Sequence, residues 1–434
     1  MNRYFNFKEL NTSYRQESVA GLTTFLAMAY ILFVNPSILS ATGMDQGAIF
    51  VATGLASALA CLIMGLWAKY PVALAPGMGI NAFFAFTVVL GMGIPWQTAL
   101  AGTFISGLIF FILTLTKIRE TIINAIPEQL KLAVASGIGL FIAFIGFQNA
   151  GIVKEAQPGT TIVALGDITA PTTLLAIFGL IVTAFFMIRR FRGAIFYGMI
   201  VTSVAGIIFG LIDLPSGVVA PIPSLEPTFG AMFSHIGEIF TPHMLVVIFT
   251  LLFVDFFDTA GTLLAVTRQA GLLVDGKLPR IGRALSADSI ATMIGAILGT
   301  STTTSYVEST SGVAAGGRTG FTSIVTAGFF ILALFFSPLL SVVTPQVTAP
   351  ALIVVGILMS SALAEIKWNE FEFAIPAFLT VVTMPLTYSI STGIALGFIL
   401  YPLTMVFRGK YKEVHPIMYV LFVVFIAYLG WAVE

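Results

Sequence analysis

The chain has 434 residues, of which 58% are hydrophobic and only 9% are charged, whereas soluble domains carry about 25% charged residues. Most of its surface must therefore face lipid, which excludes an ordinary soluble protein. Its 20 Lys and Arg residues balance its 20 Asp and Glu residues, so charge gives no reason to expect nucleic acid or another acidic partner.

The sequence predicts no disulfide, metal site or cofactor. Cys61 is the one cysteine, and His235, His243 and His415 lie far apart in sequence without a metal-binding spacing. The polar first residues also lack the pattern of a cleavable signal peptide.

Apolar runs predict fourteen membrane spans, because a helix needs about 20 mainly apolar residues to cross the hydrocarbon core. The first seven cover 19–36, 47–68, 71–92, 97–116, 131–149, 170–188 and 194–212. The second seven cover 244–266, 284–299, 303–317, 320–342, 346–364, 370–387 and 389–407. A last apolar stretch, 416–432, is either an extra crossing or an interfacial helix.

The basic residues support this topology in an inner or plasma membrane. With the N-terminus in the cytoplasm, 19 of the 20 Lys and Arg residues lie inside and only Lys154 lies outside. The segment 213–243 has no Lys or Arg and is expected outside, as a loop or surface helix. The segment 267–283 is expected to be a cytoplasmic loop.

Seven spans on each side of 213–243 indicate a duplication whose halves are inverted, because each half holds an odd number of crossings. Inverted repeats usually place the substrate at their interface, near the bilayer midplane.

The third and tenth spans, Pro71–Phe86 and Gly299–Gly317, are too rich in Gly, Pro and hydroxyl residues to be plain helices. They occupy corresponding positions in the two halves, which is a pointer to a binding site. In each, we expect a short extended piece followed by a half-helix that begins near Asn81 or Glu308. The alternative is that these glycines only allow close helix packing.

Four acidic residues are expected at or near membrane depth. Asp255 and Asp258 lie three residues apart in the eighth span, on roughly one helix face. Glu308 lies at the break of the tenth span. No Lys or Arg lies at comparable depth to neutralise them, so a protonated acid is expected. For Asp255 and Asp258 the alternative is a structural hydrogen bond to the backbone, and for Asp288, at the start of the ninth span, it is an ordinary helix cap.

Polar and aromatic residues of the first and third spans are weaker candidates. Thr23 and Thr24 could line a cavity, although Thr in membrane helices often bonds to its own backbone. Phe25, Phe83 and Phe84 could stack on a flat ring, but the chain has 39 Phe residues.

Three motifs in combination carry a family resemblance: APGMGINAFFAF, FVDFFDTAGTL and TSYVESTSGVAAGGRTG. Together they resemble the AzgA-like hypoxanthine/guanine and adenine permeases of the nucleobase–ascorbate transporter superfamily. The likeness extends from GLTTFLAMAYILFVNP to HPIMYVLFVVF, which is nearly the whole chain.

The resemblance implies an all-α membrane protein with fourteen spans in two inverted sevens, and short antiparallel strands in spans three and ten. It also implies a core domain (1–120 and 244–345) and a gate domain (121–243 and 346–434). In the uracil and xanthine relatives, the tenth span has Asn after a Glu or Gln, and the order Thr-Arg further on. This chain departs from that pattern, because Ser309 takes the place of the Asn and the order is Arg318-Thr319.

The resemblance further implies that an acid of the eighth span and Glu308 bind a purine, with Asn81 assisting. The full set of expected substrate-binding residues is Glu308, Asp258, Asp255, Asn81, Gly79, Thr24, Phe25 and Ser309. The expected proton-coupling residues are Asp258, Asp255, Glu308 and Asp288.

The expected function is secondary active import of a purine nucleobase, with hypoxanthine or guanine favoured over adenine, by proton symport with alternating access. A neutral planar base needs apolar faces and a few hydrogen-bonding groups at its edge. The aromatic, acidic and polar candidates named above supply both. Rival interpretations are a transporter of another planar or anionic solute (uracil, xanthine or a carboxylate) and a membrane-embedded enzyme. The sequence leaves open whether the chain acts as a monomer or a homodimer.

Overall fold

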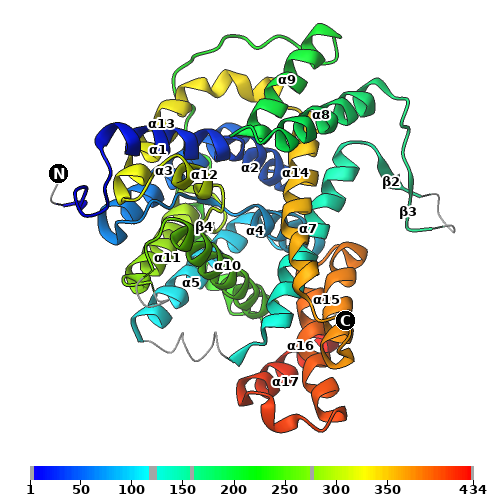
Figure 1. The fold of residues 1–434 in the computed structure, drawn as a ribbon. Coiled ribbons are helices and arrows are strands. Elements are labelled where there is room, and N and C mark those ends of the chain that lie inside the picture. The colour runs from blue at the N-terminus through cyan, green and yellow to red at the C-terminus, as the bar shows by residue number, and fades with distance from the viewer. Residues whose placement is uncertain (1–3, 117–124, 157–160, 274–277, 432–434) are drawn as a thin grey trace.

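The computed structural model describes residues 4–116, 125–156, 161–273 and 278–431, and most of them are helical (Figure 1). Four of the basic residues used to orient the chain, Arg3, Lys117, Arg119 and Lys277, lie outside the described residues.

The elements of the first half match the predicted spans. They are α1 (Tyr14–Met28), α2 (Ile31–Leu39) with η1 (Ser40–Thr42), α3 (Gln46–Ile63) with η2 (Met64–Ala68), β1 (Leu74–Pro76), α4 (Met78–Ala82) with η3 (Phe83–Gly91), α5 (Trp96–Thr116), α7 (Glu128–Asn149), β2 (Val153–Glu155), β3 (Val163–Leu165), α8 (Pro171–Ile188) and α9 (Ala194–Ile208). Spans one and three are interrupted, the first between α1 and α2 and the third between β1 and α4.

The second half follows the same plan. Its elements are η4 (Ala231–Ile239), α10 (Pro242–Gln269), α11 (Ile281–Leu298), β4 (Thr303–Ser305), α12 (Ser309–Ala314), α13 (Gly320–Ala333) with η5 (Leu334–Val342), α14 (Pro345–Ser360) with η6 (Ser361–Glu365), α15 (Phe371–Thr387), α16 (Ile390–Phe407), η7 (Tyr411–Glu413) and α17 (Pro416–Trp431). The segment expected as an outside loop or surface helix contains the short helix η4.

Within the described residues, ten helical segments are long and apolar enough to cross a membrane. Shorter apolar helices cover 78–91, 194–208, 371–387 and 416–430. Together with the strand and short helix of the tenth span, these segments account for every predicted crossing and for the extra apolar stretch. The chain is a multi-pass, mostly helical membrane protein.

Polar side chains fix where several helices begin. The side chains of Ser13, Asp45, Thr241 and Ser389 each accept a hydrogen bond from a backbone N–H in the first turn of α1, α3, α10 and α16. Such caps satisfy donors that a helix leaves free at its start.

The helices pack into two groups. The strand group consists of α1–α5 and α10–α13 around β1 and β4, and the α7–α14 group consists of α7–α9 and α14–α16. Figure 1 shows α7 and α14 side by side, with α8 and α9 on one side of them and α15 and α16 on the other.

Packing within the groups repeats when the two halves are exchanged. The second span packs on the eleventh (α3 on α13), as the ninth packs on the fourth (α11 on α5). The sixth packs on the seventh (α8 on α9), as the thirteenth packs on the fourteenth (α15 on α16). The third and tenth spans pair through β1 and β4, and the fifth and twelfth through α7 and α14. This is the pattern expected of an inverted repeat.

Glycines allow the close contact between α7 and α14. A side chain at Gly356 would collide with the carbonyl oxygen of Gly139, and one at Gly146 would collide with Ile353. Small residues of this kind let the backbones of membrane helices approach each other.

Helix α17 runs back along α16. Ser391, near the start of α16, and Tyr428, near the end of α17, have hydroxyl oxygens 3.1 Å apart, and the rings of Phe398 and Phe425 are 5.3 Å apart. Because α17 lies antiparallel to a spanning helix and exposes apolar side chains such as Val423, this arrangement favours a further crossing over a helix lying flat on the surface.

Candidate functional site

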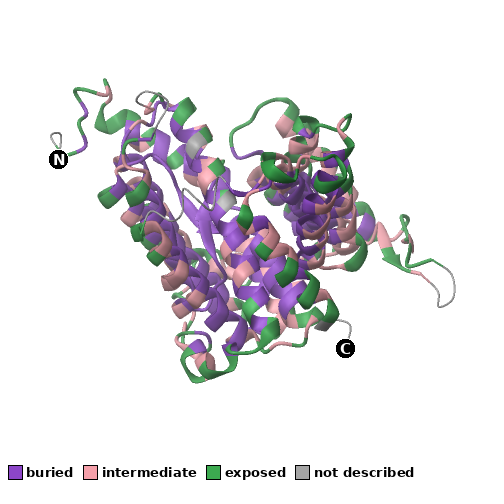
Figure 2. Ribbon diagram, turned by 90° about the horizontal axis from the view of Figure 1, so that it is seen from below, coloured by how far each residue is buried: buried purple, intermediate pink, exposed green. Residues whose placement is uncertain are grey.

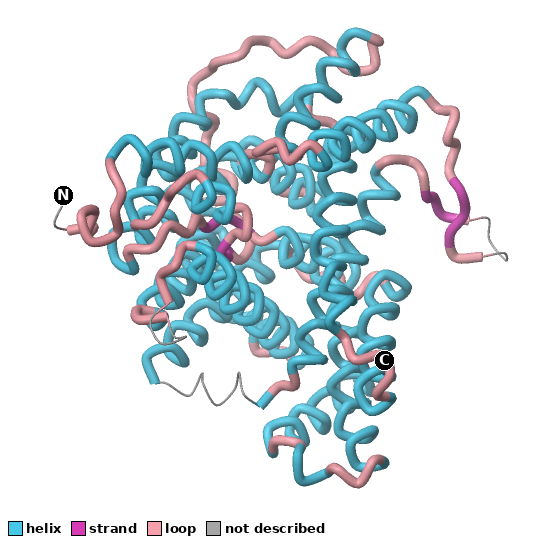
Figure 3. Tube along the Cα trace, viewed as in Figure 1, coloured by secondary structure: helices cyan, strands magenta, loops and turns pink. Residues whose placement is uncertain are grey.

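A pair of short antiparallel strands lies at the centre of the strand group (Figure 3). Ala75 of β1 is paired with Thr304 of β4, and beyond the strands the Gly77 N–H donates to the carbonyl oxygen of Thr302 (2.9 Å). Both strands are fully buried, as Figure 2 shows for the ribbon between the helices. The pairing satisfies backbone groups that neither lipid nor a helix could satisfy at this depth.

Asp258 lies in the middle of α10, and its side chain is exposed. Thr304 of β4 donates a hydrogen bond from its hydroxyl to Asp258 Oδ2 (3.2 Å). An ionisable side chain at the middle of a span avoids lipid and faces the bundle interior or a water-filled space. We therefore infer that this carboxylate faces a space that water and a solute can reach.

Glu308 caps the short helix α12, directly after β4, so the predicted half-helix start at this residue is confirmed. Its side chain is half-buried, and its Oε1 accepts a hydrogen bond from the hydroxyl of Tyr30 (2.7 Å). Tyr30 lies at the interruption between α1 and α2. Glu308 and Asp258 both lie beside β4, since Asp258 is bonded to Thr304 of that strand and Glu308 follows the strand by three residues.

Asp255 and Asp288 form a second pair of acids, and both are buried. Thr292, one turn after Asp288 in α11, donates to Asp255 Oδ2 (3.5 Å), and Thr259 donates to Asp288 Oδ1 (2.9 Å). The second carboxylate oxygen of each acid has no hydrogen-bond partner among the described residues. The expected alternative of a helix cap at Asp288 is wrong, because α11 begins at Ile281 and places this acid well inside the helix.

The two pairs of acids are linked by hydroxyl groups. The hydroxyl oxygens of Thr304 and Thr259 are 2.9 Å apart, and each also contacts one acid, Asp258 or Asp288. A continuous chain of hydrogen-bonding groups therefore runs from the exposed acid to the buried one.

Asn81 lies inside α4, whose first residue is Met78, so the expected half-helix start at Asn81 is three residues too late. The residue is buried, and its Oδ1 accepts a hydrogen bond from Ser301 just before β4. Its amide nitrogen has no partner in the described part of the chain. This leaves one unused donor close to the strand pair.

The other expected residues mainly support the framework. A side chain at Gly79 would collide with Ile138 of α7, so this glycine allows the two helix groups to meet. Ser309 Oγ accepts a hydrogen bond from the N–H of Ala73 (3.0 Å), which joins α12 to the residue before β1.

The two threonines of the first span differ. Thr23 bonds to the carbonyl oxygen of Val19 in its own helix (2.8 Å), whereas the buried hydroxyl of Thr24 has no described partner and lies against Gly312 of α12. Phe25 packs on α13, with its ring stacked on Phe329 at 5.6 Å. The structure therefore brings Thr24 to α12 and turns Phe25 to α13.

Two polar residues of this region, Tyr30 and Glu17, were not expected from the sequence. Tyr30 could have been noticed as a hydroxyl in the middle of an otherwise apolar run. Glu17 is buried near the start of α1 and accepts hydrogen bonds from the backbone N–H groups of Arg318 (3.0 Å) and Thr319 (3.2 Å). It holds the turn between α12 and α13, but no local sequence pattern indicates a partner that distant in the chain.

Within the part of the chain that the structure describes, no basic side chain forms an ion pair with Asp255, Asp258, Asp288 or Glu308. Among the described residues, the ion pairs of the chain lie elsewhere and involve Glu238, Glu370 and Glu372. The same residues contain no group of three His, Cys, Asp or Glu side chains placed to hold a metal ion. The site thus combines acids, hydroxyls and one amide without a cation.

Sequence comparison decides the family. A model described as "Permease family" matches residues 15–396. The chain belongs to this permease family. It is 62% identical over 437 residues to the guanine/hypoxanthine permease PbuG of Bacillus subtilis, with 99% of each chain covered. It is 43% identical to the adenine permease AdeQ of Escherichia coli, with 96% of this chain and 93% of the relative covered.

A solved structure confirms the fold. The transmembrane domain of the cyanobacterial bicarbonate transporter BicA matches with a TM-score of 0.60 at 16% identity, covering 88% of this chain and 97% of that one. At that identity the likeness shows the fold alone. The family and its relatives confirm the resemblance to purine permeases that the motifs carried, and they identify the chain as a membrane transporter.

Proposed function

We propose that this permease imports purine nucleobases, with hypoxanthine and guanine preferred and adenine as a further substrate, by proton symport. The observation that carries the proposal is the placement of Glu308 and Asp258 beside the strand pair, where neither has an ion-pair partner among the described residues. The names of the relatives, guanine/hypoxanthine and adenine permeases, support the substrate class.

The proposed site matches the edge of a purine. The carboxylates of Glu308 and Asp258 accept hydrogen bonds from ring N–H groups, and the unused amide N–H of Asn81 donates to a ring carbonyl or nitrogen. Tyr30 positions Glu308 through its hydroxyl. A hydrogen bond to a charged group contributes about 1.5–3 kcal/mol, so two such acids supply much of the affinity and the orientation.

Proton coupling is supported by the number of hydrogens that the hydrogen bonds of the hydroxyl chain require. Three contacts, from Asp258 through Thr304 and Thr259 to Asp288, need three hydrogens, and the two hydroxyls provide only two. The third would come from a protonated carboxyl group at one end of the chain: that acid then donates to its threonine, whose own hydrogen turns from the acid to the other threonine. We propose that a proton enters at Asp258, and that rotation of the two hydroxyls passes it to Asp288.

Transport then follows from movement of one helix group against the other. We propose that the strand group, with boundaries near 1–120 and 244–345, is the core domain that carries the substrate. The α7–α14 group, near 121–243 and 346–434, is the gate. The contact of Gly79 with Ile138 lies between them and is one surface along which the groups would move.

An anion transporter is the second candidate, because a bicarbonate transporter has the same fold. Central acids without a basic partner disfavour a bound anion, whereas they suit a neutral base that donates N–H groups. The charge of the site therefore favours the nucleobase.

Purified protein in liposomes tests the proposal. With an inward proton gradient and labelled hypoxanthine, we expect accumulation that excess guanine competes away and a protonophore abolishes. Uptake that requires sodium, or that persists with the protonophore, contradicts proton symport. Uptake of bicarbonate but not of hypoxanthine contradicts the substrate class.

We further propose that the chain lies in the cell membrane with its N-terminus in the cytoplasm. Because Cys61 is buried, cysteines introduced at Lys154, near Pro223 and at Arg190 can be probed with little background. The first two should react with an impermeant thiol reagent from outside, and the third should not. Labelling of all three contradicts the orientation.

A further inference from the structure

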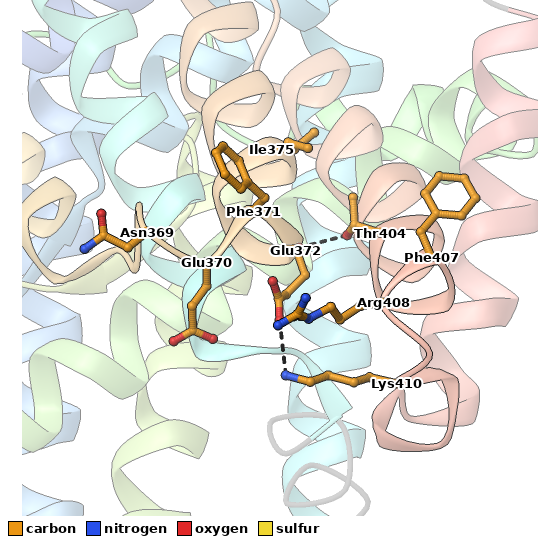
Figure 4. A pocket seen from close by; sticks show the side chains of 9 residues that line it. All are labelled: Asn369, Glu370, Phe371, Glu372, Ile375, Thr404, Phe407, Arg408 and Lys410. Carbon is orange, nitrogen blue, oxygen red and sulfur yellow. Dashed lines mark hydrogen bonds and ion pairs between the residues drawn. The ribbon is translucent and has the colours of Figure 1, made fainter.

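A pocket of about 470 Å³ lies between the first turn of α15 and the last turn of α16 (Figure 4), and none of the candidate-site acids Asp255, Asp258, Asp288 and Glu308 lines it. Its volume falls within the range of about 300–1,000 Å³ that is typical of sites for small molecules. Helix α16 is long and apolar enough to cross a membrane, and α15 is a shorter apolar helix packed along it, so we expect the end that carries the charged residues to lie at the level of the lipid headgroups.

The pocket has an acidic side and a basic side. Glu370 and Glu372 lie at the N-terminal end of α15, while Arg408 and Lys410 follow the C-terminal end of α16. These are the ends at which the helix dipole favours acids and bases, respectively. Glu372 is nearly buried, and its Oε1 lies 3.1 Å from Lys410 Nζ and 3.4 Å from Arg408 Nε.

This ion-pair network leaves hydrogen-bonding capacity unused. Arg408 is 66% exposed and contacts Glu372 through Nε, and no described residue accepts from its two Nη nitrogens. Glu370 is 43% exposed, with Oε1 at 3.4 Å from Lys367 Nζ, and its other oxygen has no described partner. The pocket thus offers a guanidinium fork, which suits phosphate, and a carboxylate oxygen, which suits an ammonium group.

Apolar side chains surround these charges. Phe371 and Phe407 line the pocket and are 73% and 82% exposed, and Ile375, one turn into α15, is 43% exposed. Exposed aromatic rings beside paired charges at headgroup level would contact the first part of an acyl chain. A soluble polar ligand gains nothing from them, which distinguishes a lipid from a free phosphate ester.

We propose that this pocket binds the headgroup of one zwitterionic phospholipid that carries a primary ammonium, of the phosphatidylethanolamine class. Its phosphate lies against Arg408 and Lys410, its ammonium against Glu370, and its acyl chains against Phe371 and Phe407. Two acids and two bases give the pocket no net charge, which matches a zwitterion better than an anionic lipid. A choline headgroup has no N–H to donate to Glu370. The proposal does not depend on the transported substrate.

Native mass spectrometry of the purified full chain tests this proposal. After delipidation, phosphatidylethanolamine, phosphatidylglycerol and phosphatidylcholine with identical acyl chains are titrated separately, and glycerophosphoethanolamine serves as the soluble headgroup. We expect one phosphatidylethanolamine per chain, bound about tenfold more tightly than the other two lipids and the soluble headgroup.

Arg408→Gln and Glu370→Gln should each weaken that binding about tenfold, since each removes one charged contact from an exposed residue without opening the core. Lys412→Gln, a nearby base that does not line the pocket, is the matched control and should leave binding unchanged. Thermal unfolding of each variant without lipid checks that the fold is retained.

Four outcomes would overturn the proposal. Tighter binding of phosphatidylglycerol would mean a plain basic patch, and equal binding of phosphatidylcholine would mean that Glu370 does not receive the ammonium. Equal binding of the soluble headgroup would mean that the ligand is not a lipid. Unchanged binding in both variants would place the lipid elsewhere.

Discussion

The two pairs of acids in the strand group differ in what can reach them. Asp258 is exposed and Glu308 half-buried, and each accepts one hydroxyl hydrogen bond, from Thr304 and Tyr30 respectively. Asp255 and Asp288 are buried behind β4, with one unpaired oxygen each. A solute could touch the first pair without any rearrangement, whereas only a proton could travel to the second.

This difference in access would let one site separate recognition of the substrate from coupling to protons. In the proposed function, the acids with access would bind the substrate, and the acid without access would store a proton delivered through Thr304 and Thr259. Resemblance to known permeases does not decide which acid of the eighth span contacts the base, but accessibility favours Asp258.

Asp258→Asn should have the largest effect. The change keeps the size of the side chain but removes the charge and the ability to carry a proton at the exposed end of the hydroxyl chain. We expect binding to weaken about a hundredfold and uptake in proteoliposomes to stop. Removing a charge at membrane depth eases insertion, so the amount of protein in the membrane should not fall. Normal uptake by this variant would remove Asp258 from the site.

Tyr30→Phe should have an intermediate effect. It deletes the hydroxyl that donates to Glu308 and preserves the ring packed at the break of the first span. Loss of one hydrogen bond to a charged group should weaken hypoxanthine binding about tenfold in a titration with purified protein. Tyr419→Phe, which removes a hydroxyl far from the site, is the control, and an equal loss in both variants would refute a specific role for Tyr30.

Thr304→Val should separate coupling from binding. Valine has nearly the same shape but interrupts the hydroxyl chain between Asp258 and Asp288. Affinity should fall by only about threefold, while accumulation driven by a proton gradient is lost and exchange without a gradient continues. Thr304→Ser keeps the hydroxyl and should accumulate substrate. If the valine variant accumulates hypoxanthine as well as the serine variant does, the proton takes another route.

Asp255→Asn should have the smallest effect on affinity. Its carboxylate is buried and bonded to Thr292, and the amide oxygen of Asn can accept the same hydrogen bond. We expect the affinity for hypoxanthine to stay within about twofold of the wild type, as measured by the same titration. A loss as large as that of Asp258→Asn would reverse the roles assigned to the two acids.

Much of the fold could be predicted from the sequence because lipid imposes a strong constraint. Apolar length set the spans, and Gly, Pro and hydroxyl residues marked the two spans that are not plain helices. The strand pair followed only from the family resemblance, because three residues such as Thr303–Ser305 carry no periodicity of their own. The hydrogen bonds between Tyr30 and Glu308 and between Glu17 and Thr319 join residues some 300 positions apart, and no local pattern encodes them.

The sequence indicated which acids are candidates for the site, but not which of them are buried. Four acids were expected, and all four lie in the strand group. The placement of Asp288 was wrong because α11 begins earlier than its apolar run indicates, so a residue expected at the helix start is buried inside it. Likewise, Asp255 and Asp258 share a helix face by spacing, yet the packing of α11 and β4 covers only one of them.

The most direct test of the account is the affinity of Glu308→Gln for hypoxanthine, measured on purified protein beside the wild type and Asp255→Asn. Glu308 lies three residues after the end of β4 and caps α12, and Gln keeps its size and one acceptor oxygen while removing the charge. If Glu308 binds the base, hypoxanthine binding should be roughly ten- to a hundredfold weaker for Glu308→Gln and nearly unchanged for Asp255→Asn. Unchanged affinity in Glu308→Gln would contradict the proposed site.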